Sequence, residues 1–485
     1  MKKLTTSLFA LALLAGCNVL DKDPLPSISP SNFFKTPDDA EAAITAAYDG
    51  IQGTGAYAQE LNVVGEMPSD NCTSSNGDVA AMENIAWMST TSQVNNVYRE
   101  AYIAINRANA VLKYVPALDM LSGRKNSILG EARFLRALSY FNLVKLYGGV
   151  PLRLEPTESG APGVLNLPRA SAEQVYQQVV TDLTDAEPLM LNANPTRATK
   201  GSVNALLARV QLTQRNWAAA QAAANKVITG GAGYALAGNY KSLFPADNKT
   251  ESVFEVQYSG NSDGGTFNIL PDLLLPSPPA TFSFPKFNIP TTELIQYADT
   301  VNDLRWKFIG RTNAGRDHGS YVDGGRGNGN DRGPFVYKWP SNPNGFNSPD
   351  NYYVLRYADV LLMYAEAANE QAGPTADALA KLNLVRQRAG LTALTTASPQ
   401  ATSKQTLRNE IDRQRRLELA FEGERWFDLL RYARHNQAEA GAHAVTALDI
   451  IAQQRQGARD ANYLLFPIPL GELNTNTQIQ QNPGY

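Results

Sequence analysis

The chain has 485 residues, of which 43% are hydrophobic, and its formal net charge is −3. This composition excludes a wholly disordered chain, and the length exceeds one ordinary core, so we expect two or more packed units. The near-zero net charge gives no support to a protein that binds nucleic acid or an anionic membrane surface.

The N-terminus carries an export signal followed by a candidate lipid anchor. Lys2 and Lys3 precede a short apolar run over 8–15, and no second apolar run is long enough to span a membrane. The run ends in LAGC, which resembles the bacterial lipobox and implies cleavage before Cys17 and acylation of that residue. Several acyl chains on one residue give a stable anchor. We predict a signal peptide over 1–16 and a lipidated Cys17.

An acidic stretch with prolines follows Cys17 and predicts an extended, solvated tether over 17–30. Two alternatives remain open. Cys17 could be a chance residue in an ordinary signal peptide, or it could pair with Cys72 in an oxidising compartment.

Helical periodicity dominates the rest of the chain. Ser171 and Gln174 form a capping box, and Gly148 ends a strongly apolar helix. A strand is predicted over 250–258, where residue types alternate, and the tail over 463–485 is predicted to be extended. The predicted helices cover residues 38–51, 93–114, 131–147, 171–187, 202–214, 216–228, 291–297, 355–369, 375–389 and 404–434.

Two predicted helix pairs resemble tetratricopeptide units, one over 202–228 and one over 364–389. Such pairs bury their apolar faces by stacking on one another. Pro, Gly, Asn and Ser interrupt the pattern from 259 to 350, which is typical of a functional loop region or a small irregular subdomain.

We therefore predict a mainly α protein, built as one domain over 31–485. A tetratricopeptide-like helical-repeat scaffold covers 31–258 and 351–485, and a loop-rich irregular region that contacts ligand or partner covers 259–350.

Four stretches of the sequence together resemble one family. They are EARFLRALSYFNLVKLYGGVPL (131–152), VLRYADVLLMYAEAANE (354–370), RQRRLELAFEGERWFDLLRY (413–432) and LLFPIPLGELNTNTQIQQNPGY (464–485). The order of these stretches and their residues resemble those of the SusD/RagB family of outer-membrane lipoproteins from Bacteroidetes. The resemblance covers nearly the whole mature chain. The EGERWFDL core and the NPGY ending are the most specific parts.

This resemblance implies a SusD-like fold and a role in nutrient uptake. The expected protein is held in the outer membrane by its lipid anchor, faces the exterior, captures oligosaccharide and delivers it to a SusC-like TonB-dependent porin. RagB-like members serve peptide uptake, so a peptide or glycopeptide cargo is the alternative. We expect no cofactor and no nucleic-acid partner.

The sequence contains no catalytic or metal-binding motif that we identify. His435 and His443 lack the spacing of a zinc-binding helix, and we interpret them, with His318, as surface residues. Glu418 and Glu422 could be catalytic, but their place in an arginine-rich helix without a loop nucleophile favours ion pairs. We predict that the chain is not an enzyme. A secreted hydrolase is the least favoured alternative, because paired carboxylates have no sequence signature.

Sugar binding needs an aromatic ring face and planar polar side chains that pair with hydroxyl groups. Two regions, 66–87 and 282–339, supply both. Any single aromatic residue is more often part of the core than of a binding site. The expected stacking residues are Trp87, Tyr321 and Trp339, and the expected hydrogen-bonding residues are Asp70, Asn71 and Arg326.

The glycine-rich stretch over 319–333 is neither a nucleotide-binding loop nor an EF-hand, because its glycines and candidate ligands do not have the required spacing. It is predicted to be a surface loop. Its alternative role is contact with a ligand or partner through Asp323, Arg326, Asn328 and Asp331.

Overall fold

The computed structural model describes residues 33–244, 247–260, 266–277, 280, 282–307, 310–311, 317–318, 321–323, 329–331, 333–339, 345–438 and 441–485. The predicted signal peptide, Cys17 and the tether lie outside these residues, and so does Arg326.

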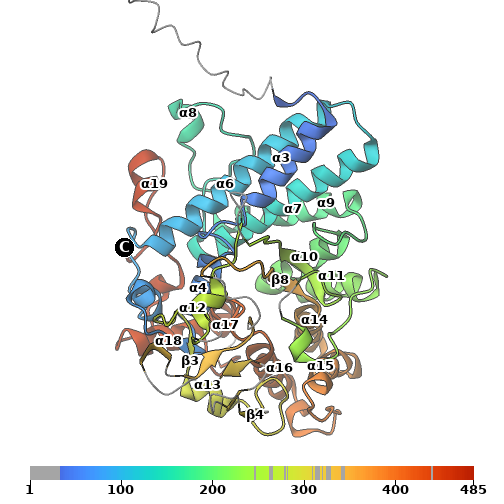
Figure 1. The fold of residues 1–485 in the computed structure, drawn as a ribbon, viewed down its shortest axis with the longest axis vertical. Helices are drawn as coiled ribbons and strands as arrows, with labels where there is room; N and C mark the ends of the chain where they lie inside the picture. Colours follow the sequence, from blue (N-terminus) through green and yellow to red (C-terminus); the bar gives the residue numbers. More distant parts are fainter. Residues whose placement is uncertain are drawn as a thin grey trace, which may run out of the picture.

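Helices packed side by side form most of the molecule (Figure 1). The stack consists of α3 (Pro37–Asp49), α6 (Ser92–Tyr114), α7 (Ser122–Tyr147), α9 (Ala172–Ala186), α10 (Lys200–Thr213), α11 (Trp217–Thr229), α14 (Tyr357–Ala372) and α15 (Ala376–Arg388). Successive members of the stack contact one another, so each helix buries its apolar stripe on the next. The predicted mainly α, tetratricopeptide-like scaffold is confirmed.

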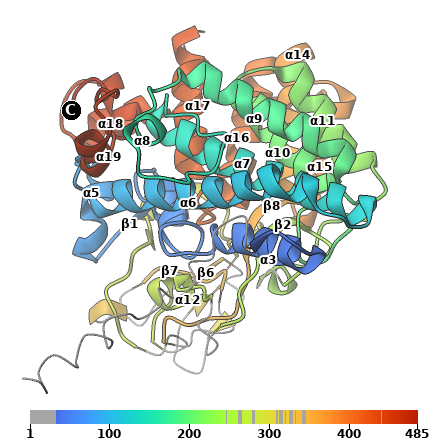
Figure 2. The ribbon, with the colours of Figure 1, turned by 90° about the horizontal axis from the view of Figure 1, so that it is seen from above.

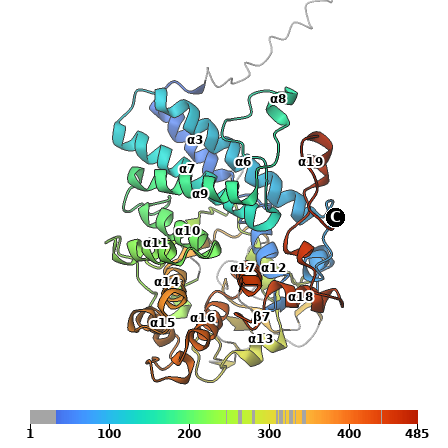
Figure 3. The same ribbon diagram turned by 180° about the vertical axis from the view of Figure 1, so that it is seen from behind.

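The two predicted helix pairs are present as α10 with α11 and α14 with α15. They are far apart in the sequence, yet α11 packs directly on α14. Figure 3 shows the two pairs continuing one stack. The intervening loop-rich region therefore leaves the scaffold and returns to it without interrupting the core.

Local sequence signals account for several helix ends. The hydroxyl of Ser171 accepts from Gln174 N, and the Gln174 side chain accepts from Ser171 N, as the predicted capping box requires. Gly148 ends α7 at φ 72°, a conformation that favours glycine. α7 itself begins at Ser122, earlier than predicted, because its first turns are polar and carry little apolar periodicity.

The helix predicted over 404–434 is wrong as a single element, because it is two helices, α16 (Lys404–Glu418) and α17 (Arg425–Ala438). Gly423, in the turn between them, has φ 75°. A Cβ on it would lie 2.9 Å from Asn62 Cα, in α4 (Glu60–Glu66). The turn therefore depends on a close backbone approach from a distant helix, which the local sequence does not reveal.

Two further boundaries differ from the sequence prediction. The start of the helix predicted from 355 is instead strand β8 (Tyr352–Arg356), which pairs antiparallel with β2 (Ser252–Val256). The tail predicted to be extended contains the short helix α19 (Leu470–Thr475). Both segments are too short for periodicity to identify.

Between 259 and 350 the described residues form only short elements, which Figure 2 shows gathered below the helical layer. β3 pairs with β1 (Cys72–Thr73), and β4, β5, β6 and β7 form a small antiparallel sheet. These elements are α12 (Leu270–Leu274), β3 (Ile289–Pro290), α13 (Thr292–Tyr297), β4 (Gly310–Arg311), β5 (Asp317–His318), β6 (Val322–Asp323) and β7 (Phe335–Val336). The remaining helices are α5 (Ala80–Glu83), α8 (Pro162–Leu165) and α18 (Ala447–Gln454).

Within the part of the chain that the structure describes, none of the helices combines the length and the apolar character needed to cross a membrane.

Candidate ligand-binding face

The two regions predicted to supply a sugar site, 66–87 and 282–339, lie against each other in the fold. β1 from the first pairs with β3 from the second. Next to this pairing, Ser75 N and Ser74 Oγ donate to Lys286 O at 3.1 and 2.9 Å, and Lys286 N donates to Ser75 Oγ at 2.8 Å. These bonds, one between main chains and two through serine hydroxyls, hold the two loops in a fixed register.

Three phenylalanines gather at this junction. Phe282 is 54% exposed, and its ring stacks on that of Phe346, with centroids 6.3 Å apart and planes at 19°. Phe284 meets the Phe346 ring edge on at 5.5 Å. A large aromatic side chain this exposed has an apolar face available to a partner. We call these three residues, with the 73–78 loop beside them, the Phe282 face.

The backbone at Phe346 is unusual. Its φ is 66°, which a bulky residue rarely adopts, and its N–H donates to Asp272 Oδ2 at 2.9 Å. Such strain persists only where the surroundings over-determine it and is concentrated at functional sites. Here it presents the Phe346 ring to Phe282.

Polar side chains border the aromatic cluster. In the 73–78 loop, Thr73, Ser75 and Asp78 are exposed, while Asn76 is buried and donates to Pro285 O at 3.3 Å. The polar 73–78 loop is therefore bonded to the segment that directly follows Phe284, and Phe282 is the exposed ring of the three. This combination can stack on the apolar side of a sugar ring and bond to its hydroxyls.

The predicted hydrogen-bonding residues Asp70 and Asn71 lie beneath this face. Asp70 forms a two-pronged ion pair with Arg425, at 2.8 and 3.0 Å, and Asn71 bonds Glu66 and Arg416. Burial alone would raise the pKa of Asp70, but the guanidinium groups of Arg425 and Arg416 lower it. Both predicted residues fasten the loop to α16 and α17, and protein groups already occupy their polar atoms.

The predicted stacking residues are buried in the core. Trp87 is 2% exposed, donates to the Tyr485 hydroxyl at 2.6 Å and packs edge on against Phe466. Tyr321 and Trp339 are 0% and 1% exposed. In this structure no face of these three rings is open to a ligand, which corrects their expected role to that of scaffold residues.

The reason for this correction is physical. Large aromatic residues between irregular segments are the main apolar material with which a loop-rich region can fill its own core. Phe282 lies within one of the two predicted regions, although it is not among the predicted stacking residues. The signal that could have identified it is its place between Pro278-Pro279 and Pro285, where no helical or strand periodicity offers a buried face.

The interpretation of Glu418 and Glu422 as ion-pair residues is supported by the structure. Glu418 is fully buried and bonds Arg356 at 2.7 Å and Arg305 at 3.1 Å, with Arg388 also in contact. Burial alone would raise the pKa of Glu418, but these guanidinium groups hold it well below its usual range. A carboxylate so fully paired has no capacity for proton transfer.

The interpretation of the histidines as surface residues is wrong for two of them. His435 and His443 are 2% and 8% exposed, and the His443 ring stacks on Tyr432 with centroids 3.8 Å apart. Burial lowers the pKa of His443 to about 2, so it is neutral at ordinary pH. Among the described residues no group of three or more His, Cys, Asp or Glu side chains could hold a metal ion.

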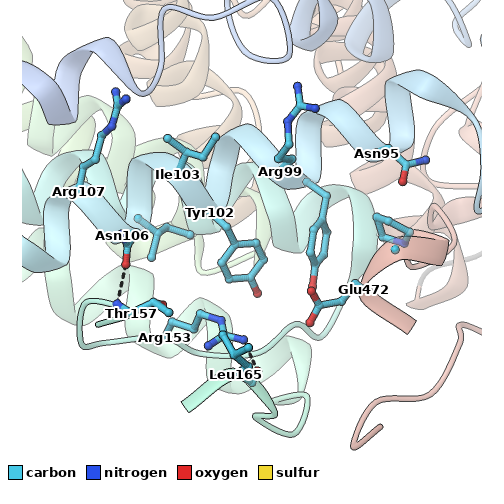
Figure 4. Close-up of a pocket in the computed structure, with 14 residues that line it drawn as sticks. Asn95, Arg99, Tyr102, Ile103, Asn106, Arg107, Arg153, Thr157, Leu165 and Glu472 are labelled. Atoms are coloured by element: carbon cyan, nitrogen blue, oxygen red, sulfur yellow. Dashed lines mark hydrogen bonds between the residues drawn. The ribbon is translucent and has the colours of Figure 1, made fainter. Parts of the chain in front are cut away.

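A separate hollow lies along α6 (Figure 4). Its volume is about 580 Å³, and its walls come from α6, the 153–165 segment and α19. Tyr102 projects from α6, the edge that also carries Arg99 and Arg107, toward Arg153 on the other edge, and Glu472 stands at one end. We call it the Tyr102 groove.

Comparison with known proteins gives consistent matches along the chain. Residues 294–485 match a family described as the SusD family, and residues 20–212 match one described as starch-binding associating with outer membrane. SusD-like protein P2 of Formosa agariphila is 26% identical over 514 residues, covering 100% of both chains. The starch-binding protein SusD of Bacteroides thetaiotaomicron is 25% identical over 511 residues, covering 89% of this chain and 86% of that protein.

A solved laminarin-binding SusD-like protein is similar in structure as well as in sequence. It shares 27% identity with a TM-score of 0.76, covering 93% of this chain and 100% of that chain. The similarity therefore includes the loop-rich region and not the helical stack alone.

Proposed function

Because this chain belongs to the SusD/RagB family, we propose that it captures an oligosaccharide outside the cell and delivers it to a SusC-like TonB-dependent transporter. The oligosaccharide binds at the Phe282 face. In this role the chain holds cargo and performs no chemistry on it, so the carboxylates of α16 and α17 are structural.

The observation that carries the proposal is the exposed Phe282 ring, stacked on Phe346, in a segment that is bonded at Pro285 and Lys286 to the polar 73–78 loop. Exposed aromatic rings on a fixed loop pair are costly to leave in water and useful to a sugar-binding protein. A starch-binding and a laminarin-binding protein among the relatives support a glycan as the cargo.

We further propose that acyl chains on Cys17 hold the protein in the outer membrane, facing the exterior. The lipobox-like LAGC supports this, and so does the relatives' described association with the outer membrane. Cys17→Ala should release the full-length chain from the membrane fraction, whereas a protein that stays there would contradict the anchor.

A peptide or glycopeptide is the second candidate cargo, because the Phe282 face offers an apolar surface that a peptide side chain could also use. The two are separated by affinity electrophoresis through gels containing laminarin, starch or xylan, with casein peptides as competitor. Retardation by one glycan without competition supports the saccharide. Binding to peptides alone would assign the peptide cargo.

The site is tested with Phe282→Ala and Phe284→Ala in the same gels. Loss of an aromatic contact should weaken glycan binding by roughly two- to tenfold, the range for aromatic pairs. Leu384→Ala, which removes another exposed apolar side chain far from the face on α15, is the matched control. If both phenylalanine variants are retarded like the control, the face is not the site.

Transfer to the transporter is tested by co-purification from outer membranes. A porin-like protein should copurify with the native chain. Failure of any outer-membrane porin to copurify would count against the delivery role.

A further inference from the structure

The Tyr102 groove is separate from the Phe282 face. Its described lining residues come from α6, the 153–165 segment and α19. Along α6 the lining extends from Asn95 to Arg107, which is about 18 Å at the rise of an α-helix. The groove is therefore long enough for an oligosaccharide and is built wholly from the rigid scaffold.

Its floor holds an aromatic ring in a fixed position. The Tyr102 hydroxyl donates to Pro151 O at 2.7 Å, and the ring contacts Tyr98 with centroids 4.9 Å apart. Tyr102 remains partly exposed, and Figure 4 shows its ring in the open space between the two edges. A ring held in this way is preorganised to stack on the apolar side of a sugar.

Planar polar groups stand on both sides of this ring (Figure 4). The Asn106 oxygen accepts from Thr157 N at 2.7 Å, which orients its amide N–H groups toward other partners. Glu472 stands at the far end, beside Pro469 and Gly471. Amide, guanidinium and carboxylate groups in fixed positions are the ones that recognise hydroxyls.

The charges favour an uncharged ligand over an acidic one. Arg99 pairs with Glu100 at 3.1 Å, and Arg107 pairs with Asp49. Arg153 donates to Val164 O at 2.8 Å, and Glu472 adds a negative charge to the groove lining. Each guanidinium thus has an acidic or carbonyl neighbour, so no net positive field attracts an anion.

A saccharide fits these walls better than a peptide does. An extended peptide is bound through its main chain, and this needs unpaired N–H and C=O groups such as those of a sheet edge. The backbone of α6 satisfies its own groups within the helix, and the groove presents side chains instead.

We propose that the Tyr102 groove is a second saccharide-binding site, which holds an uncharged segment of the same polysaccharide that occupies the Phe282 face. The inference rests on the proposed glycan-binding function. Two sites on one rigid body bind a polymer by avidity, so a long chain is held far more tightly than a short one.

The decisive variant blocks the groove without removing a structural contact. Gly471 lines the groove, and a Cβ there meets no atom within 4 Å. Gly471→Met therefore adds a bulky side chain to the groove lining without a clash at its Cβ. Gly123→Met, where a Cβ also meets nothing within 4 Å, is the matched control on α7. Tyr102→Ala is the second groove variant, checked for folding because it loses the bond to Pro151.

The probe is an array of laminarin, starch, xylan, galactan and mannan with their hexasaccharides, and casein peptides as further spots. Gly471→Met should weaken binding of the retained polymer by roughly tenfold to a hundredfold, whereas Gly123→Met should leave it unchanged. Phe282→Ala with Gly471→Met should retain less hexasaccharide than Phe282→Ala alone, whereas Phe282→Ala with Gly123→Met should retain as much as Phe282→Ala alone.

Other results overturn the inference. If Phe282→Ala alone abolishes hexasaccharide binding and Gly471→Met changes nothing, the groove is not a saccharide site, while the proposed function stands. If the groove variants lose only the casein spots, its ligand is a peptide. If the native chain binds no glycan on the array, the inference and the proposed function both fail.

Discussion

The turn between α16 and α17 and the Phe282 face differ in which side chains are buried and which are exposed. At the turn, Glu418 and Glu422 are buried among arginines and a lysine, with their ion pairs closed off from solvent. At the Phe282 face an apolar ring is exposed to solvent and stacks on a second ring, that of Phe346. In the sequence Glu418 and Glu422 resemble catalytic carboxylates, but in the structure they are buried and paired. The exposed Phe282 ring is accessible to a ligand.

The difference shows how this fold separates stability from binding. Buried charges that are fully paired hold distant segments in one arrangement, and removing one partner is costly. Exposed rings contribute little to stability, so they can be kept for a ligand. Substitutions in the two regions should therefore separate unfolding from loss of binding.

The largest effect is expected for Glu418→Ala. It leaves Arg305, Arg356 and Arg388 buried around a missing carboxylate, which should cost about 5 kcal/mol of unfolding free energy or more. Chemical denaturation measures the loss. Glu187→Ala, which breaks a half-exposed pair with Lys226, should cost below about 1 kcal/mol and serves as control. Equal costs for the two would refute the central role of Glu418.

Trp87→Ala should follow, because it empties a core position. Truncating a fully buried Trp costs about 3–5 kcal/mol, and here the bond to Tyr485 is lost as well. Thermal unfolding measures this change. Below the melting temperature the folded variant should still bind glycan. If Trp87→Ala abolished glycan binding without changing stability, Trp87 would be a ligand-binding residue.

A pH-dependent effect of intermediate size is expected at Glu60. Burial raises its pKa to about 7, only partly offset by a hydrogen bond with Asn96, and Oε2 has no bonding partner. The folded state therefore keeps a proton that the unfolded state releases. The stability associated with this proton is present below pH 4.5 and is lost as pH rises toward 7.

Glu60→Gln removes this penalty. It should raise the unfolding free energy at pH 8 by roughly 1–3 kcal/mol and change it little at pH 4.5. Urea denaturation at the two pH values gives the comparison. A difference of the same size at both pH values would show that the carboxyl does not titrate in this range.

The smallest change in stability is expected for Phe282→Ala. Its side chain is more than half exposed, so the unfolding free energy should shift by no more than about 0.5 kcal/mol. Denaturation beside the binding gels then gives the sharpest contrast with Glu418→Ala. A loss of several kcal/mol would mean that Phe282 belongs to the core of the loop-rich region.

Much of the scaffold could be predicted from local pattern. The capping box at Ser171, the helix stop at Gly148 and the small residues of α10 and α11 each act within one or two turns of the chain. The break between α16 and α17 at Gly423 could not be predicted in this way. It depends on the close approach of the Asn62 backbone, which is hundreds of residues away in the sequence.

The candidate site was predicted at the level of regions and not of residues. The segments around Asn71 and Phe282 contain the right residue types, and the structure brings them together through β1 and β3. Composition could not tell that Trp87 and Trp339 face inward while Phe282 faces solvent. In irregular segments no period fixes the direction of a side chain.

By itself the sequence determined that the chain carries an export signal pattern, a helical-repeat scaffold and the residues of its family. These follow from short-range periodicity and from motifs that lie within a few residues. Only the tertiary structure decided which aromatic rings are buried, which carboxylates are paired and where the surface is hollowed. Those outcomes depend on contacts between segments far apart in the chain, and burial arises only when such segments pack.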